Sequence, residues 1–138
     1  MKQQNKIPEG WKLKELKEIF TIETGTTPPT KEKIYWENAN INWATPADLG
    51  KLNGNIHFQE SERKISEPAL RDVNLTLMPE NTIIVSTRAP VGYAVVIKKE
   101  STFNQGCKGL IPKKENDADP YYYCYYLLNN NYELQNRA

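Results

Sequence analysis

The apolar positions of the chain fall into short runs that polar residues, prolines and glycines separate. Two of these runs are rich in β-branched residues, TIIVST at 82–87 and YAVVI at 93–97, and such runs are typical of strands. The intervening stretch, RAPVG at 88–92, carries a proline and a glycine, so the pattern predicts a tight connection between two strands. Shorter runs at 21–23 and 41–44 predict two further strands.

Four stretches carry helix signals, and one of them is TPADL at 45–49, a turn with helix-start chemistry at Thr45. In KLKELKEIF, at 12–20, the apolar residues share one face and the charged residues the other, which predicts a short amphipathic helix, with Trp11 as an anchor into the core. Ser66 precedes a proline-bearing first turn and predicts an N-cap for helical residues 69–72. An Asp-Pro pair predicts the start of a last helix over 121–130, whose tyrosines and leucines are mostly packing residues.

The remaining segments connect these elements. Residues 52–58 contain an Asn-Gly pair and predict a turn or a hairpin, and 103–112 predict a glycine-marked turn into a last strand. Residues 116–119 have the composition of a solvated linker. A chain of 138 residues has the size of one domain, 1–138, with a modest core.

Residues 24–49 stand out as a long stretch with little secondary-structure signal. Gly25 and the two prolines at 28–29 begin it, and lysines and large aromatic residues follow. Loops of this length are uncommon in a compact domain unless they bind something, so we expect a binding loop here. The alternative is a surface loop whose aromatic residues fold back to cover the core, namely Tyr35, Trp36 and Trp43.

Composition excludes several classes of function. The net charge of +1 gives no bulk attraction for nucleic acid or membrane, and the sequence has no bilayer-spanning run and no signal peptide. Cys107 and Cys124 form no CxxC pair, which favours a reduced, cytoplasmic protein but leaves a single disulfide open. His57 is the only histidine, and its neighbours favour a half-exposed strand position over a catalytic role. Both glycine-rich phosphate-binding motifs are missing, so we expect no nucleotide cofactor in this chain.

One alternative interpretation is a small Mg²⁺-dependent nuclease. Asp48 and Glu62 would hold the metal and Lys64 would steady the developing charge. The lysine of such a site should lie on an apolar strand, whereas here it lies in QESERK. The sequence DPYY at 119–122 is similar to a motif of amino-methyltransferases, but a helix cap explains it fully.

A third pattern is a set of basic, hydroxyl, amide and aromatic side chains that recur at the predicted turns. Such side chains supply contacts to DNA phosphates and to base edges. The candidate DNA-binding residues are Thr26, Thr27, Lys31, Lys33, Tyr35, Trp36, Arg63, Lys64, Ser86, Thr87, Arg88, Asn104, Gln105 and Lys108. The near-neutral charge leaves open a protein-interaction module without a nucleic-acid partner.

Five blocks, in order along the chain, resemble a known family. They are IPEGW at 7–11, GTTP at 25–28 with Tyr35 and Trp36 nearby, INWATPADL at 41–49, STRAPVG at 86–92 and NQG at 104–106. Together they resemble a target recognition domain from the specificity (S) subunit of type I restriction–modification systems. The resemblance covers residues 7 to about 130.

The resemblance implies an α+β fold, with an irregular coiled β region, a short N-terminal helix, and a C-terminal helix as part of a helical hairpin. It implies a non-catalytic domain that reads one half of a two-part DNA sequence. It also implies partner subunits for modification and restriction, with S-adenosylmethionine in the modification (methyltransferase) subunits. Residues that read bases are then also expected in the less recognisable stretches 56–73 and 98–104.

The family pattern continues beyond the blocks that this chain matches. A long helix normally follows, usually with a second recognition domain and a second helix after it. Because the sequence stops before the first long helix, we expect an excised domain, a half-length relative or a shuffled recognition cassette.

Overall fold

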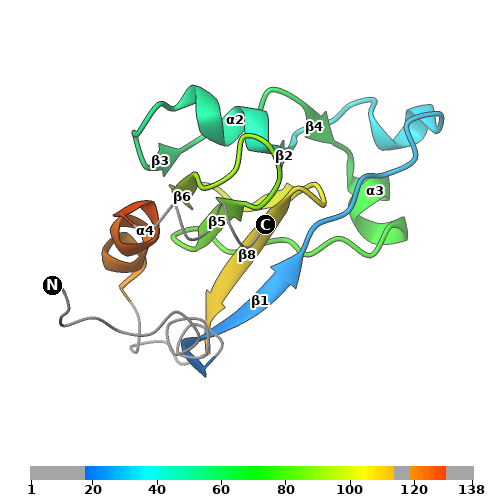
Figure 1. Ribbon diagram of the computed structural model, residues 1–138. Helices are drawn as coiled ribbons and strands as arrows, with labels where there is room; N and C mark the ends of the chain where they lie inside the picture. The colour runs from blue at the N-terminus through cyan, green and yellow to red at the C-terminus, as the bar shows by residue number, and fades with distance from the viewer. Residues whose placement is uncertain (1–17, 114–118, 130–138) are drawn as a thin grey trace, which may run out of the picture.

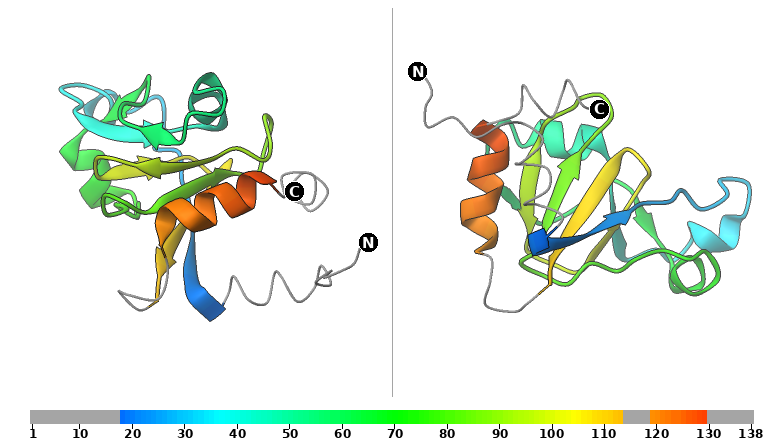
Figure 2. Two further views of the ribbon diagram at one scale, coloured as in Figure 1. Left: turned by 90° about the vertical axis from the view of Figure 1, so that its left-hand side faces the viewer. Right: turned by 60° about the horizontal axis from the view of Figure 1, so that its bottom comes forward.

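The computed structural model describes residues 18–113 and 119–129, and these residues form two sheets and a few short helices (Figure 1). The larger sheet has the strand order β1-β8-β5-β6-β3, and the smaller sheet has the order β4-β2-β7. Figure 2 shows three layers: helix α4 on one face of the larger sheet, and the smaller sheet with helix α2 on the other. The predicted α+β class is confirmed.

The larger sheet is antiparallel except at one edge. Its strands are β1 (Phe20–Thr24), β8 (Cys107–Pro112), β5 (Ile83–Ser86), β6 (Ala94–Ile97) and β3 (His57–Phe58). Only the β3–β6 pair is parallel. Of the two possibilities expected for 52–58, the turn is confirmed and the hairpin is not formed, because β3 pairs with β6 instead. The paired strands on either side of RAPVG are confirmed.

The two central strands explain the apolar runs that predicted them. Side chains alternate across β5, so that Ile83 and Val85 face α4, whereas Ile84 faces the smaller sheet. Both faces of this strand are therefore buried, and so are both faces of β6. A strand buried on both faces reads as a continuous apolar run rather than an alternating one.

The smaller sheet consists of β2 (Ile41–Ala44), β4 (Lys64–Ile65) and β7 (Ser101–Phe103). Strand β2 lies between the other two, antiparallel to β4 and parallel to β7. The sequence predicted β2 but gave no signal for β7, where a polar Ser-Thr pair is completely buried. Burial of these hydroxyls is possible because they are hydrogen-bonded, as Thr102 is to the carbonyl of Asn42 at 2.7 Å.

The helices begin at the residues whose chemistry predicted a start. Thr45 caps α2 (Pro46–Lys51) in a capping box with Asp48, and Ser66 accepts a hydrogen bond from the Ala69 N–H at the start of α3 (Glu67–Asp72). Helix α4 (Pro120–Asn129) follows Asp119, whose side chain accepts from the Tyr121 N–H. A further 3-10 turn, η1 (Lys33–Tyr35), lies in the long loop.

The predicted N-terminal helix is only partly within the part of the chain that the structure describes. Residues 18–19 are helical, but Phe20 is the first residue of β1, so the predicted helix end at Phe20 is wrong. Trp11 and residues 12–17 lie outside the described residues, as do residues 116–118 of the predicted linker and residue 130 of the predicted last helix. Across the described ranges, no helix combines the length and the apolar character needed to cross a membrane.

Both cysteines are buried free thiols, so the disulfide left open by the sequence is not formed. Burial raises the pKa of Cys107 and of Cys124 to about 12, and Asp48 adds to the effect at Cys107. Only a thiolate reacts readily, so we expect the folded chain to resist a thiol-reactive dye at pH 8 and the urea-unfolded chain to react with two equivalents. Rapid labelling of the folded chain would contradict this burial.

Candidate nucleic-acid interface

The long loop after β1 is anchored on the turn between β7 and β8. The Thr26 N–H donates to the Phe103 carbonyl at 3.1 Å, and the side chains of Thr27 and Gln105 are hydrogen-bonded. A Cβ at Gly25 would lie 2.1 Å from the Asn104 carbonyl oxygen, so only glycine fits where the two segments cross. The loop is therefore held at one end of the larger sheet.

The β5–β6 turn meets the same β7–β8 turn. The N–H groups of Thr87 and Arg88 both donate to the Gly106 carbonyl, at 2.9 and 3.2 Å. The Asn104 N–H in turn donates to the Ala44 carbonyl at 3.0 Å, which ties β2 to the same place. Three predicted clusters of polar residues, far apart in the sequence, thus lie side by side, and the side chains of Arg88 and Gln105 are exposed there.

The aromatic residues of the long loop pack as the alternative interpretation expected. Trp43 is 2% exposed and its indole N–H donates to the Thr26 carbonyl at 3.0 Å. Trp36 is half-buried, donates to the Pro29 carbonyl at 3.0 Å and meets Trp43 edge-on with ring centroids 5.2 Å apart. Tyr35 packs against the same cluster and its hydroxyl donates to Asp72 at 3.4 Å. These rings pack between the long loop and the core and hold the loop in place.

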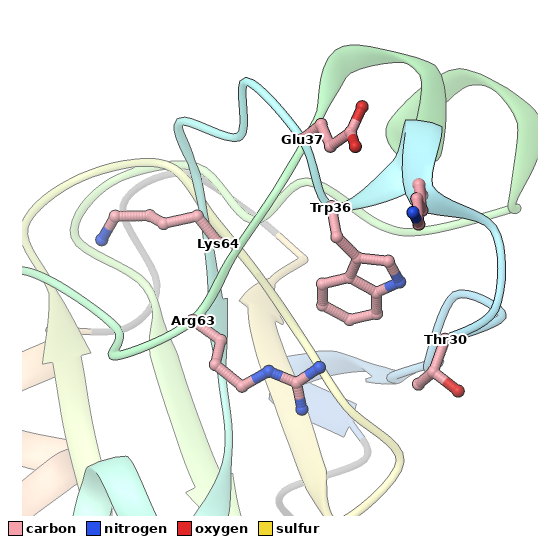
Figure 3. A pocket seen from close by; sticks show the side chains of 6 residues that line it. Thr30, Trp36, Glu37, Arg63 and Lys64 are labelled. Carbon is pink, nitrogen blue, oxygen red and sulfur yellow. The ribbon is translucent and has the colours of Figure 1, made fainter.

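A cleft of about 410 Å³ opens beside this cluster, lined by Thr30, Lys33, Trp36, Glu37, Arg63 and Lys64 (Figure 3). The guanidinium carbon of Arg63 lies 4.5 Å from the Trp36 ring centroid and 5.1 Å from that of Trp43. Such stacking orients the guanidinium without neutralising its charge.

Lys64 sits differently from its neighbour. Its ammonium donates to the Asn42 side-chain oxygen and to Glu60, both at 2.7 Å. Hydrogen bonds from Lys64 and then Lys99 hold the pKa of Glu60 at about 2, so this carboxylate is ionised at neutral pH. Lys64 is therefore half-buried in an internal network, whereas Lys31, Lys33 and Arg88 are exposed.

The chain matches a known family over nearly its whole length. The family model for the type I restriction modification DNA specificity domain matches residues 8–137. This chain belongs to that family.

Two relatives of this specificity domain come from Methanocaldococcus jannaschii and Escherichia coli. The specificity subunit of the type I restriction enzyme MjaIX from Methanocaldococcus jannaschii is 40% identical over 123 residues, covering 89% of this chain and 27% of the relative. The specificity subunit of the type I restriction enzyme EcoprrI from Escherichia coli is 34% identical over 120 residues, covering 81% of this chain and 28% of the relative. The specificity domain thus spans about a quarter of the length of these relatives.

Solved structures share the fold of the specificity domain. The HsdS subunit from Thermoanaerobacter tengcongensis matches with a TM-score of 0.65 and 24% identity, covering 88% of this chain and 28% of that one. The type I restriction–modification S subunit from M. genitalium matches with a TM-score of 0.55 and 13% identity, covering 88% of this chain and 27% of that one.

The geometry of the specificity domain does not favour the nuclease interpretation. Asp48 closes the capping box of α2 and accepts from the Glu62 N–H at 3.2 Å. Glu62 pairs with Lys51, and Lys64 is bound within its own network. Among the residues that the structure describes, no three acidic, histidine or cysteine side chains form a group that could hold a metal ion.

One of the predicted DNA-binding residues is corrected by its position. Ser86 is completely buried, its hydroxyl donates to the Pro90 carbonyl at 2.7 Å, and it accepts from the Tyr93 N–H at 3.0 Å. Its side chain shapes the β5–β6 turn and cannot reach a ligand outside.

The other predicted residues divide into two groups. The first group lies where the long loop, the β5–β6 turn and the β7–β8 turn meet: Thr26, Thr27, Thr87, Arg88, Asn104 and Gln105. It also includes the residues that line the cleft: Lys33, Trp36, Arg63 and Lys64. Lys31 precedes η1 and is exposed, Tyr35 packs inward, and Lys108 donates to the Thr24 hydroxyl at 3.2 Å beside the loop. Sequence reasoning missed the role of Trp43 in supporting Arg63, for which the only signal was a second tryptophan, in the strand-like run 41–44 that follows Trp36.

Proposed function

We propose that this specificity domain binds double-stranded DNA and reads one half of a two-part target. The interface is the loop junction: residues 25–36, Arg63, the β5–β6 turn and the β7–β8 turn. The observation that carries the proposal is that these segments carry four exposed cations, Lys31, Lys33, Arg63 and Arg88. Within residues 18–113 and 119–129, none of the four has a carboxylate at ion-pair distance. Unpaired cations on one surface suit phosphates and base edges.

The domain acts in this proposal without chemistry of its own. The comparisons support a role within a specificity subunit that works with modification and restriction subunits. The family resemblance implies that S-adenosylmethionine and adenine methylation belong to the modification subunits. A cytoplasmic location fits such an assembly. This assignment rests on the family, because the chain spans only about a quarter of its relatives.

Selection from a random duplex library tests the proposal. We expect the 138-residue chain to enrich one short, continuous sequence at low salt, since a single recognition domain reads one half-target. Equal binding to every duplex would show that the chain binds DNA without sequence preference. No binding at either low or physiological salt would favour a protein-interaction module instead.

Arg88 offers a prediction at the junction. Its backbone is fixed by Gly106 and its side chain is exposed. If it contacts a phosphate, Arg88→Ala should weaken binding to all duplexes and reduce the slope of log affinity against log salt by about one. If it contacts guanine, the cost should be about 1–3 kcal/mol with relaxed preference at one position.

Titrations of wild type and Arg88→Ala with the selected and a scrambled duplex distinguish these cases. Arg71→Ala is the matched control, because Arg71 is exposed but lies 3.6 Å from Asp72 on α3. Unchanged binding by a folded Arg88→Ala chain would exclude Arg88 from the interface.

A further inference from the structure

We propose that Arg63 reads a guanine, with Trp36 and Trp43 as the positioning residues that aim its guanidinium into the cleft. The inference rests on the proposed function and assigns a base contact within it. Arg63 lies in the stretch 56–73, which none of the five family-like blocks includes. It is the lining residue of the cleft that combines an exposed charge with a fixed side chain.

The support beneath Arg63 is rigid because both indoles are themselves held. Trp43 is buried and bonded to the Thr26 carbonyl, and Trp36 is bonded to the Pro29 carbonyl. The two rings meet at 83°, so they form two walls of a corner rather than one flat surface. The guanidinium carbon lies within 5.1 Å of both ring centroids, which restricts where the side chain can point.

The hydrogen-bonding groups of Arg63 remain unused. Across the described part of the chain, its guanidinium forms no hydrogen bond and no ion pair, although the neighbouring Lys64 forms both. A guanidinium that packs against aromatic rings can still donate through the N–H groups that point away from them, and no described protein acceptor takes those of Arg63. Arg63 therefore presents a fork of donors at the cleft that it lines, and Figure 3 shows its guanidinium beside the ring of Trp36.

Guanine is the base that this fork fits. Its major-groove edge carries two adjacent acceptors, O6 and N7, which a guanidinium meets with two parallel hydrogen bonds. Adenine offers one acceptor and one donor at the same positions, so an all-donor group discriminates against it. Holding the side chain before binding reduces the rotamer entropy lost on binding, which favours a specific contact over a mobile phosphate contact.

The experiment removes one acceptor from the DNA. After the target of the wild-type chain is selected, each guanine is replaced in turn by 7-deazaguanine, which lacks N7 but still pairs with cytosine. We expect one guanine at which wild-type affinity falls roughly tenfold or more, the effect of losing a hydrogen bond to a charged group. Arg63→Ala should bind the unmodified target more weakly and show no further loss at that guanine.

Three variants sharpen the test. Arg71→Ala, with an arginine paired on α3, should keep the wild-type response to 7-deazaguanine. Trp36→Leu should keep nonspecific affinity but lose most of the response, and Trp36→Phe should recover part of it. Thermal midpoints show that each variant is folded.

The outcomes separate this inference from the function on which it rests. If the wild type selects a target and Arg63→Ala responds to 7-deazaguanine like wild type at every position, the inference is overturned and the proposed function stands. A selected target without guanine overturns it as well. If the wild type selects no sequence, the proposed function fails and the assignment of Arg63 fails with it.

Discussion

Replacement of Trp43 by alanine is expected to lower the free energy of unfolding by about 3–5 kcal/mol. The indole is 2% exposed and forms one cluster with Ile65 and Ala69, so its removal leaves a cavity between the smaller sheet and the long loop. It also leaves the Thr26 carbonyl without its partner. Urea unfolding followed by circular dichroism measures the loss.

Trp36→Ala is the matched control for Trp43→Ala. The two rings are in contact, but Trp36 is half-buried and lies against the open cleft, so its removal should destabilise the domain less. Equal losses for the two variants, or a loss below about 1 kcal/mol for Trp43→Ala, would contradict the position of Trp43 in the core.

Gly25→Ala is expected to destabilise the domain by at least about 2 kcal/mol, in the upper range for overpacking. The added Cβ would lie 2.1 Å from the Asn104 carbonyl oxygen and 2.4 Å from that of Phe103, and these carbonyls accept hydrogen bonds from the N–H groups of Cys107 and Thr26. Neither segment can move without separating the long loop from the β7–β8 turn. Duplex affinity should therefore fall along with stability.

Gly54→Ala isolates the purely conformational part of that effect. Gly54 has a φ of +96° and open space around it, so alanine there meets no atom and incurs only left-handed backbone strain, about 1–2 kcal/mol. The Gly25 variant should be the less stable of the two and the only one with weakened DNA binding. If Gly54→Ala weakens binding equally, the crossing at Gly25 is not what organises the interface.

Local chemistry was enough to predict elements whose signals lie within a few residues. Caps at Thr45, Ser66 and Asp119 marked helix starts, and the β-branched runs around Ile84 and Val95 marked the central strands. The short strands β7 and β3 gave no such signal. β7 is polar in sequence, and its buried hydroxyls are tolerated because they form hydrogen bonds to β2. β3 has two residues and pairs in parallel with β6, which lies far along the chain.

The same holds for the candidate site: the sequence predicted which residue types occur at each turn, but not which turns meet in the fold. Sequence alone proposed turns rich in basic and polar residues, but it could not say that Thr26, Arg88 and Asn104 meet around one turn. Nor could it separate Arg63 from Lys64, which are adjacent in the sequence: one stacks on indoles with its donors free, and the other is bound to Asn42 and Glu60. Ser86 looked like a phosphate ligand because burial is invisible in a polar, hydroxyl-rich motif.

The salt dependence of duplex binding tests most directly whether the long loop faces DNA. Lys31 and Lys33 are exposed, and no described carboxylate pairs with either, so replacing both by alanine should barely change the thermal midpoint. Lys113 is the control, because it follows β8 at the end of the larger sheet opposite the loop, where Phe20 pairs with Pro112.

The measurement is the affinity of one duplex at several salt concentrations for wild type, Lys31→Ala/Lys33→Ala and Lys113→Ala. We expect the double variant to bind more weakly at low salt and its slope of log affinity against log salt to fall by up to about two, while Lys113→Ala keeps the wild-type slope. A folded double variant with wild-type affinity at low salt, where the electrostatic contribution is largest, would contradict a DNA-facing loop.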